Sequence, residues 1–303
     1  DYGHEEDRML TEYRIAAQPG QRYAMRQIGA LVPDLMHGEP HWQAARLVMA
    51  GAWSGYDEVR EDNRAAWADL WKGRPVLIGA DDKWQDLADA SFFYLHSSVH
   101  RSSPCSVAPF GLSRRQEYSG HVFWDAETFM FPATLLTDPE AAKAMLEYRC
   151  RQAPRARMNA KLTGYAGLQF PWQTGNHGWE VTPFYSEGIK EEHINLDVAF
   201  AMGQYVEATG DELFFRQHAW PVIQGVAEWI ASRVKETERG FEIHHLVGID
   251  ESLSNVNNDA ETNALAAIVL RRATACARRL GFAPPARWTE IADRMFIPID
   301  PGS

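Results

Sequence analysis

The chain has 303 residues, of which 45% are apolar, and a formal net charge of -11 at pH 7. This length and composition allow one large domain or two smaller ones around a sizeable core. The acidic balance, with cations scattered among the acids, argues against a nucleic-acid or anionic-membrane surface and favours a neutral or cationic ligand. No apolar run approaches the roughly twenty residues that span a bilayer, and no pattern assigns a compartment.

The first elements in chain order are predicted strands. The runs EYRIAA at 12–17 and RYAMRQIGALV at 22–32 are separated by Gln18-Pro19-Gly20, which is typical of a turn. Residues from about 42 to 71 then have helical periodicity. Their apolar positions are Ala45, Val48, Ala52, Val59, Ala66 and Leu70.

Helices are predicted for most of the chain after residue 83. Helical patterns cover 83–99, 140–163, a stretch ending at Gly210, 212–234 and 258–280, with a short strand or ribbon at 240–248. Asp138 and Asp211 are predicted N-caps, and Gly210 a helix stop. Pro154 is expected to kink or end the helix that contains it. Helices that arrive in pairs suggest a bundle or a toroid.

The loop HHLVGIDESLSNVNNDAETN at 244–263 places two adjacent acids, Asp250 and Glu251, between the ribbon and the next helix. Loops on a rigid scaffold often carry catalytic groups. The alternative is that either acid caps a helix or is merely solvated. The asparagines of this loop can satisfy its backbone groups and hold the acids in place.

The segment SGHVFWDAETFMFP at 119–132 contains Asp125 and Glu127. Aromatic rings can cover the C–H face of a sugar, while carboxylates accept hydrogen bonds from its hydroxyls. The segment therefore predicts half of a sugar subsite; the alternative is that its rings are core and Asp125 caps a helix. The aromatic residues concerned are Phe123, Trp124, Phe129 and Phe131.

A third segment, GYAGLQFPWQTGNHGWEVTP at 164–183, is a long aromatic loop. Loops of this length are usually functional or disordered, and this one is too aromatic for disorder. Trp172 and Glu180 are candidate sugar contacts. His177 and His193 are given no catalytic role, because a single histidine is more often structural, although His193 is kept as a substrate contact.

Motifs of other chemistries are missing from the sequence. It has no HExxH or other metal-ligand spacing, no GxxxxGK[ST], no GxGxxG after a strand and no GxSxG. We therefore expect neither a metal nor a cofactor, and acids among aromatic rings remain as the candidate chemistry.

Together these segments resemble glycoside hydrolase family 65. The blocks GHVFWDAETFMFP, PEAAKAMLEYR, GYAGLQFPW with GWEVTP, EEHINLDVAFAMGQYVEATGDELFF, AEWIASRV and GIDESLSNVNNDAETN occur in that family's order. The resemblance implies a mainly α chain: the last strands of a β-sandwich at 1–40, a helical linker at 41–80 and about the first half of an (α/α)6 toroid at 81–303.

The resemblance also implies roles for particular residues. The family's Gly-Pro-Asp/Asn-Glu-Tyr segment ends in the general acid, which maps onto Glu251, although Ile249 and Ser252 replace the usual Pro and Tyr. This departure puts the shape of the leaving-group subsite in doubt. The family's Trp-Asp pair, which contacts the nonreducing glucose, maps onto Trp124 and Asp125.

Three readings of function follow. The first is an inverting α-glucoside hydrolase, acting on a kojibiose-like disaccharide or a glucosyl-galactosyl unit, in which a second carboxylate activates water. The second is an inverting phosphorylase of the same family. The third is a fragment or subunit that is inactive without a second chain or a missing C-terminal segment, because the family's base and phosphate-binding loop lie beyond the position matching Ser303. Self-association is also possible for a half-toroid with exposed apolar faces.

Overall fold

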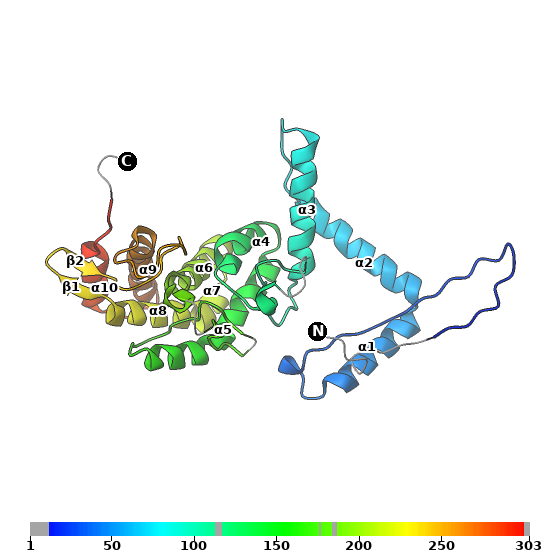
Figure 1. Cartoon of the computed structure of the whole chain (residues 1–303), viewed down its shortest axis with the longest axis horizontal. Coiled ribbons are helices and arrows are strands. Elements are labelled where there is room, and N and C mark those ends of the chain that lie inside the picture. Colours follow the sequence, from blue (N-terminus) through cyan, green and yellow to red (C-terminus); the bar gives the residue numbers. More distant parts are fainter. Residues whose placement is uncertain (1–11, 113–116, 176, 184–186, 300–303) are drawn as a thin grey trace. The chain divides into compact units, whose positions relative to one another are not determined.

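The computed structural model describes residues 12–112, 117–175, 177–183 and 187–299, and it is mainly helical (Figure 1). The chain divides into two compact units, Asp1–Trp67 and Ala68–Ser303. Within the described ranges, no helix has the length and apolar character needed to cross a membrane.

The first unit contains no β-strand among its described residues, 12–67. The backbone turns at Gln18–Gln21, but the segments predicted as strands on either side pair with nothing. An isolated two-stranded hairpin is only marginally stable in water without further strands or a packed face. The strand pattern of these two segments therefore does not lead to a sheet by itself. The β-sandwich that the resemblance implies stays a prediction.

The predicted helical stretch at 42–71 forms two helices, α1 (Pro40–Ser54) and α2 (Tyr56–Leu70). They are separated at Gly55, whose φ of 82° suits glycine and breaks the helical ladder. Neither helix buries a residue. Of the apolar positions expected from the periodicity, Val48 and Leu70 are half-buried and the other four are exposed. Trp53 on α1 is 86% accessible.

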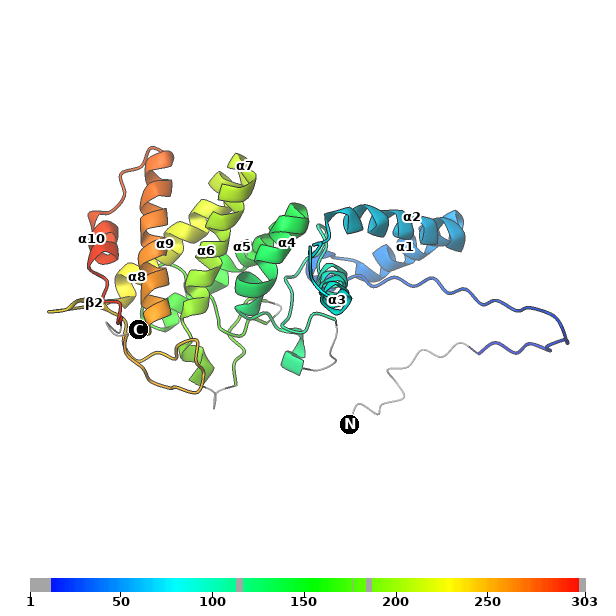
Figure 2. The same cartoon turned by 90° about the horizontal axis from the view of Figure 1, so that it is seen from above.

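The second unit is built from antiparallel helices. In Figure 2, α4, α6 and α9 stand side by side, with α5 and α8 behind them. Most residues of α6 are buried, because it packs against α5, α8 and α9. The helices of this unit are α3 (Asp82–Ser98), α4 (Phe131–Thr137), α5 (Pro139–Leu162), α6 (His193–Thr209), α7 (Glu212–Phe214), α8 (Trp220–Arg233), α9 (Ala260–Arg279) and α10 (Ala286–Arg294).

Short elements connect these helices. A two-stranded antiparallel ribbon, β1 (Lys235–Thr237) with β2 (Gly240–Glu242), follows α8. The π-helical turns are η5 (Ala126–Met130) and η7 (Phe215–Ala219), and the 3₁₀ turns are η2 (Asp34–Met36), η3 (Trp71–Gly73), η4 (Glu117–Gly120) and η6 (Glu187–Lys190).

The helix-capping predictions are confirmed. The side chain of Asp138 accepts a hydrogen bond from the backbone N–H of Ala141, and that of Asp211 accepts one from Phe214. Gly210 ends α6 in the left-handed region, with φ of 68°. Capping and helix-stop residues act on backbone groups within four residues, so the sequence alone is enough to predict them.

Two boundary predictions are wrong, and a third is wrong in part. Helix α5 does not end at Pro154 but runs through it to Leu162, because Ala156 and Ala160 beyond the proline are fully buried and their packing offsets the lost backbone bond. The kink stays a prediction. The stretch at 212–234 is interrupted by the π-turn η7, which lets Pro221 occupy the first turn of α8. The ribbon predicted at 240–248 is a strand only to Glu242. Helix α10 was not predicted.

Candidate active site

The Trp124–Asp125 pair opens the π-turn η5, and both residues are half-buried. Asp125 has helical backbone angles and its side chain does not cap the turn. Burial raises the pKa of Asp125. The capping alternative is thereby removed.

The predicted aromatic residues are partly brought together. The rings of Phe123 and Trp172 meet edge to face with centroids 4.9 Å apart, and Phe123 is buried. The Trp124 ring lies 4.8 Å from the His193 ring, also edge to face. Phe129, at 5.1 Å from Trp124, is largely exposed. The two loops predicted to contact sugar therefore share one aromatic cluster.

His193 is buried between two carboxylates. Its Nδ1 lies 3.0 Å from Asp197 Oδ2, and its Nε2 lies 3.6 Å from Glu191 Oε2. Burial by itself would lower the pKa of His193, but the two carboxylates outweigh burial and raise it to about 9. The raised pKa favours the imidazolium form at neutral pH. The imidazole ring meets the Trp124 ring edge to face.

Glu191 is 2% exposed and lies between His193 and Trp172. Burial raises its pKa; His193 and Trp172 oppose that shift, and the charge of Glu251 adds to it. Oε2 of Glu191, Nε2 of His193 and Nε1 of Trp172 are all buried without a hydrogen-bond partner. Burial of such atoms is costly, and Glu191 Oε2 and His193 Nε2 face each other at 3.6 Å as an ion pair.

Glu251 is exposed in the loop between β2 and α9. The backbone N–H of Val247 donates to Lys190 O at 3.1 Å, which holds this loop beside the segment that carries Glu191. Neighbouring Asp250 accepts hydrogen bonds from the backbone and hydroxyl of Ser252. The Glu251 loop thus lies beside the segment that carries Glu191, and Glu191 pairs with His193, whose ring meets Trp124.

Glu180 has a structural position. Its carboxylate accepts hydrogen bonds from the backbone N–H groups of Trp172, Gln173 and Thr182 and from the Thr182 hydroxyl. These bonds close the hairpin that carries Trp172. The sugar contact predicted for Glu180 remains untested, but its oxygens already have four donors.

Glu127 was expected to face a sugar hydroxyl, and this expectation is wrong. Its side chain is buried, and both oxygens bind Arg149, at 2.7 Å to Nε and 2.8 Å to Nη2. A cavity of about 150 Å³ adjoins Glu127, Asp197 and Glu261. Among the described residues, no group of three or more His, Cys, Asp or Glu side chains could hold a metal ion.

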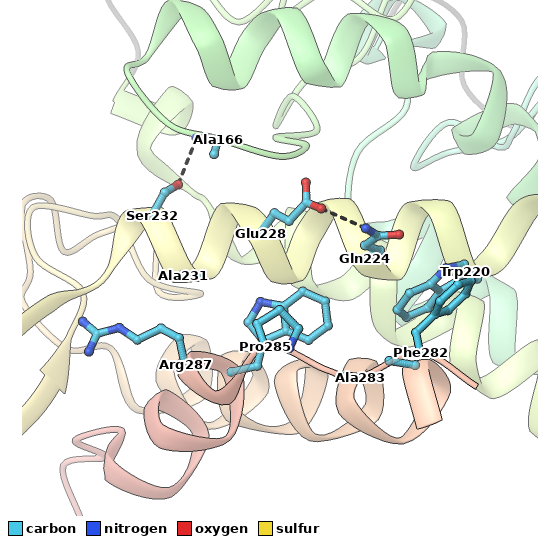
Figure 3. A pocket seen from close by; sticks show the side chains of 12 residues that line it. Ala166, Trp220, Gln224, Glu228, Ala231, Ser232, Phe282, Ala283, Pro285 and Arg287 are labelled. Atoms are coloured by element: carbon cyan, nitrogen blue, oxygen red, sulfur yellow. Dashed lines mark hydrogen bonds between the residues drawn. The ribbon is translucent and has the colours of Figure 1, made fainter. Parts of the chain in front are cut away.

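A second cavity, of about 620 Å³, lies between α8 and the segment joining α9 to α10 (Figure 3). Trp220 and Phe282 stack there with ring centroids 6.4 Å apart, and Gln224 donates to Glu228. No predicted site residue is among the described residues that line this groove.

Sequence reasoning missed Glu191 and Arg149. Arg149 falls at helical spacing from Ala142, Met145 and Ala156, all buried, so a cation on an apolar helix face was a usable signal. Glu191 precedes α6 within a run of charged residues and carries no comparable local signal. Its importance comes from contacts with residues far away in the sequence.

Comparison with known proteins adds a family match. Residues 90–302 match the glycosyl hydrolase family 65 central catalytic domain. The chain is 37% identical over 280 residues to the kojibiose hydrolase of Flavobacterium johnsoniae, covering 92% of this chain and 41% of that protein. It is 38% identical to the protein-glucosylgalactosylhydroxylysine glucosidase of Gallus gallus, covering 80% of this chain and 36% of that protein.

A phosphorylase is similar to almost the same extent. The kojibiose phosphorylase of Caldanaerobacter subterraneus is 33% identical, covering 81% of this chain and 36% of that protein. A solved structure assigned as a kojibiose phosphorylase from the human microbiome has the same fold, with a TM-score of 0.75 at 20% identity over 88% of this chain and 37% of that one. The chain spans about two fifths of the length of these relatives.

Proposed function

The chain belongs to glycosyl hydrolase family 65, and from that membership we propose that it forms part of an inverting α-glucoside hydrolase. The substrate is a kojibiose-like disaccharide or a glucosyl-galactosyl unit, and glucose is released. Glu251 is the general acid that protonates the glycosidic oxygen. Trp124 and Asp125 hold the nonreducing glucose, with Phe123, Trp172, Glu180 and His193 as further substrate contacts.

The observation that carries this proposal is the set of contacts between the Trp124 segment and the Glu251 loop. The Trp124 ring meets His193, His193 pairs with Glu191, and the carbonyl of Lys190 next to Glu191 accepts from Val247 in the Glu251 loop. A sugar seated on Trp124 would therefore place its glycosidic bond toward the acid-bearing loop. The Glu251 carboxyl is exposed at that rim, where a bound sugar could contact it.

The rest of the catalytic apparatus is proposed to come from outside these 303 residues. An inverting hydrolase needs a second carboxylate roughly 6.5–9.5 Å from the acid, to activate water on the opposite face of the sugar. We assign that base to a continuation of the polypeptide or to a second chain, which would also complete an (α/α)6 toroid. The two terminal hairpins of a half-toroid would then gain packing partners.

The decisive experiment replaces Glu251 with Gln in the complete protein. A general acid contributes about 10²- to 10⁴-fold, so kcat on kojibiose should fall by that range, while the melting temperature stays unchanged because the side chain is exposed. Initial product examined by NMR should be β-glucose in the wild type. An unimpaired Glu251→Gln variant would remove the acid assignment.

Asp250→Asn provides the matched control. It removes the same charge one residue away, yet keeps the Oδ1 acceptor that holds Ser252. Its activity should stay close to that of the wild type. An equal loss of kcat in both variants would mean that activity depends on the net charge of the loop and not on a proton donated by Glu251.

A phosphorylase is the second candidate, favoured by the similar identity to kojibiose phosphorylase and hydrolase sequences. The two activities differ in the nucleophile that attacks the anomeric carbon. Turnover that requires phosphate and yields β-glucose 1-phosphate would establish the phosphorylase, whereas turnover in phosphate-free buffer establishes the hydrolase.

A further inference from the structure

Arg149 lies on α5 with its side chain fully buried. A buried arginine is rare unless its charge is paired. Here the guanidinium makes four hydrogen bonds: Nε and Nη2 donate to the two oxygens of Glu127, Nη2 also donates to Phe123 O at 3.2 Å, and Nη1 donates to the Thr174 hydroxyl at 2.9 Å.

Two of these acceptors flank the Trp124–Asp125 pair. Phe123 precedes the pair and Glu127 follows it by two residues, so one planar guanidinium is bonded on both sides of it. The carbonyl of Trp124 meanwhile accepts from the backbone N–H groups of Glu127 and Thr128. The backbone on both sides of Trp124 and Asp125 is therefore held by buried hydrogen bonds.

The third acceptor belongs to the other predicted sugar-contacting loop. Thr174 exchanges two backbone hydrogen bonds with Val122, at 3.0 and 2.9 Å, and receives Nη1 of Arg149 on its hydroxyl. Thr174 also forms a bridge with Glu180, whose carboxylate holds the backbone of Trp172. Arg149 thus joins the segment that carries Trp124 to the hairpin that carries Trp172.

Stability alone gives little reason for such an arrangement, because an apolar pair of similar volume is often as stable as a buried ion pair. Geometry gives a reason, because a binding site needs its side chains held to within about 0.5 Å by the residues around them. We propose that Arg149, acting with Glu127, is a positioning residue that sets Trp124, Asp125 and Trp172 against a bound sugar. This inference rests on the proposed function of those three residues.

The test is the double variant Arg149→Met/Glu127→Leu in the complete protein. It removes both charges together, so neither is left buried and unpaired, and we expect the fold to be retained. A positioning role predicts that kcat/KM on kojibiose falls at least tenfold, toward the roughly 100-fold that a 1 Å misplacement can cost. A purely structural role predicts unchanged kcat/KM at a temperature where the variant is folded.

Hydrogen–deuterium exchange supplies a readout that does not depend on activity. Peptides covering 119–132 and 170–183 should exchange faster in the double variant, while those of α6 and α9 stay unchanged. Wild-type turnover of kojibiose tests the proposed function. The local change in exchange tests whether Arg149 and Glu127 hold the two segments, whatever the substrate, and kcat/KM separates positioning from a purely structural role.

Lys143→Met is the matched control, because Lys143 lies on the same helix and pairs with Asp211, away from the Trp124 segment. It should leave exchange at 119–132 and kcat/KM unchanged. If the double variant does not fold, Arg149→Lys is the alternative, because it keeps the charge without the bidentate guanidinium. It should show the same fall in kcat/KM and the same faster exchange at 119–132. A folded variant of either kind with wild-type kcat/KM and exchange would overturn the inference.

Discussion

At the residue scale, three acids that stand in similar aromatic segments have different surroundings. Asp125 is half-buried and does not cap its turn, Glu127 is bound at both oxygens by Arg149, and Glu180 accepts four hydrogen bonds. The Asp125 carboxyl accepts only from its own backbone N–H, so of the three it keeps the most acceptor capacity for a ligand. The sequence alone gives no reason to treat these three acids differently. The hydrogen-bond partners of each carboxylate in the folded chain distinguish them.

His193 gives a pH-dependent prediction at this scale. Its folded pKa of about 9 lies above the ordinary value of 6.5, so its ion pairs contribute fully below pH 6.5 and lose that contribution as the pH rises through 9. The melting temperature of His193→Gln should therefore lie below that of the wild type at neutral pH, and the gap should narrow above pH 9.

Thermal unfolding of both proteins across that pH range measures the effect, and an NMR titration of the His193 ring measures the pKa directly. His177→Gln is the control, because His177 is exposed. A gap that stays constant from pH 7 to beyond 9 would show that the imidazole is not paired as described.

At the element scale, the loop after α5 is held directly against α8. Gly167 has φ of 74°, and the backbone N–H of Leu168 donates to Gly225 O at 2.9 Å. A Cβ on Gly167 would lie 2.1 Å from that carbonyl oxygen and 2.6 Å from Trp229 N. The contact between the two elements therefore depends on the absence of a side chain.

Gly167→Ala should consequently destabilise the protein by more than Gly164→Ala. Both positions have positive φ, for which alanine costs roughly 1–2 kcal/mol, but a Cβ on Gly164 would meet no atom within 4 Å. The clash at Gly167 adds about 1–3 kcal/mol of overpacking. Urea denaturation would compare the two variants, and equal losses would contradict the close approach to α8.

At the scale of the whole molecule, the two units differ in how much they bury. Helices α1 and α2 bury no residue, whereas α6 buries most of its length. A 15-residue helix without packing is marginal in water. The amide hydrogens of α1 and α2 in the 303-residue chain should therefore exchange within the fastest class, while those of α6 and α9 exchange slowly.

Exchange monitored by mass spectrometry would test this difference. Trp42 and Trp53 on α1 are 60% and 86% exposed, so this helix has no buried face that would slow its exchange. Equal protection of α1 and α6 in the 303-residue chain would contradict the burial described for these helices.

The sequence by itself determined the family, the mainly helical class and the helix ends marked by Asp138, Asp211 and Gly210, because these depend on blocks and caps spanning a few residues. The tertiary structure alone decided that α5 continues through Pro154, that Glu127 binds Arg149 and that Glu191 stands beside His193 and the Glu251 loop. Those outcomes depend on burial and on partners distant in the chain, and no local pattern encodes the charge or the packing that such partners supply.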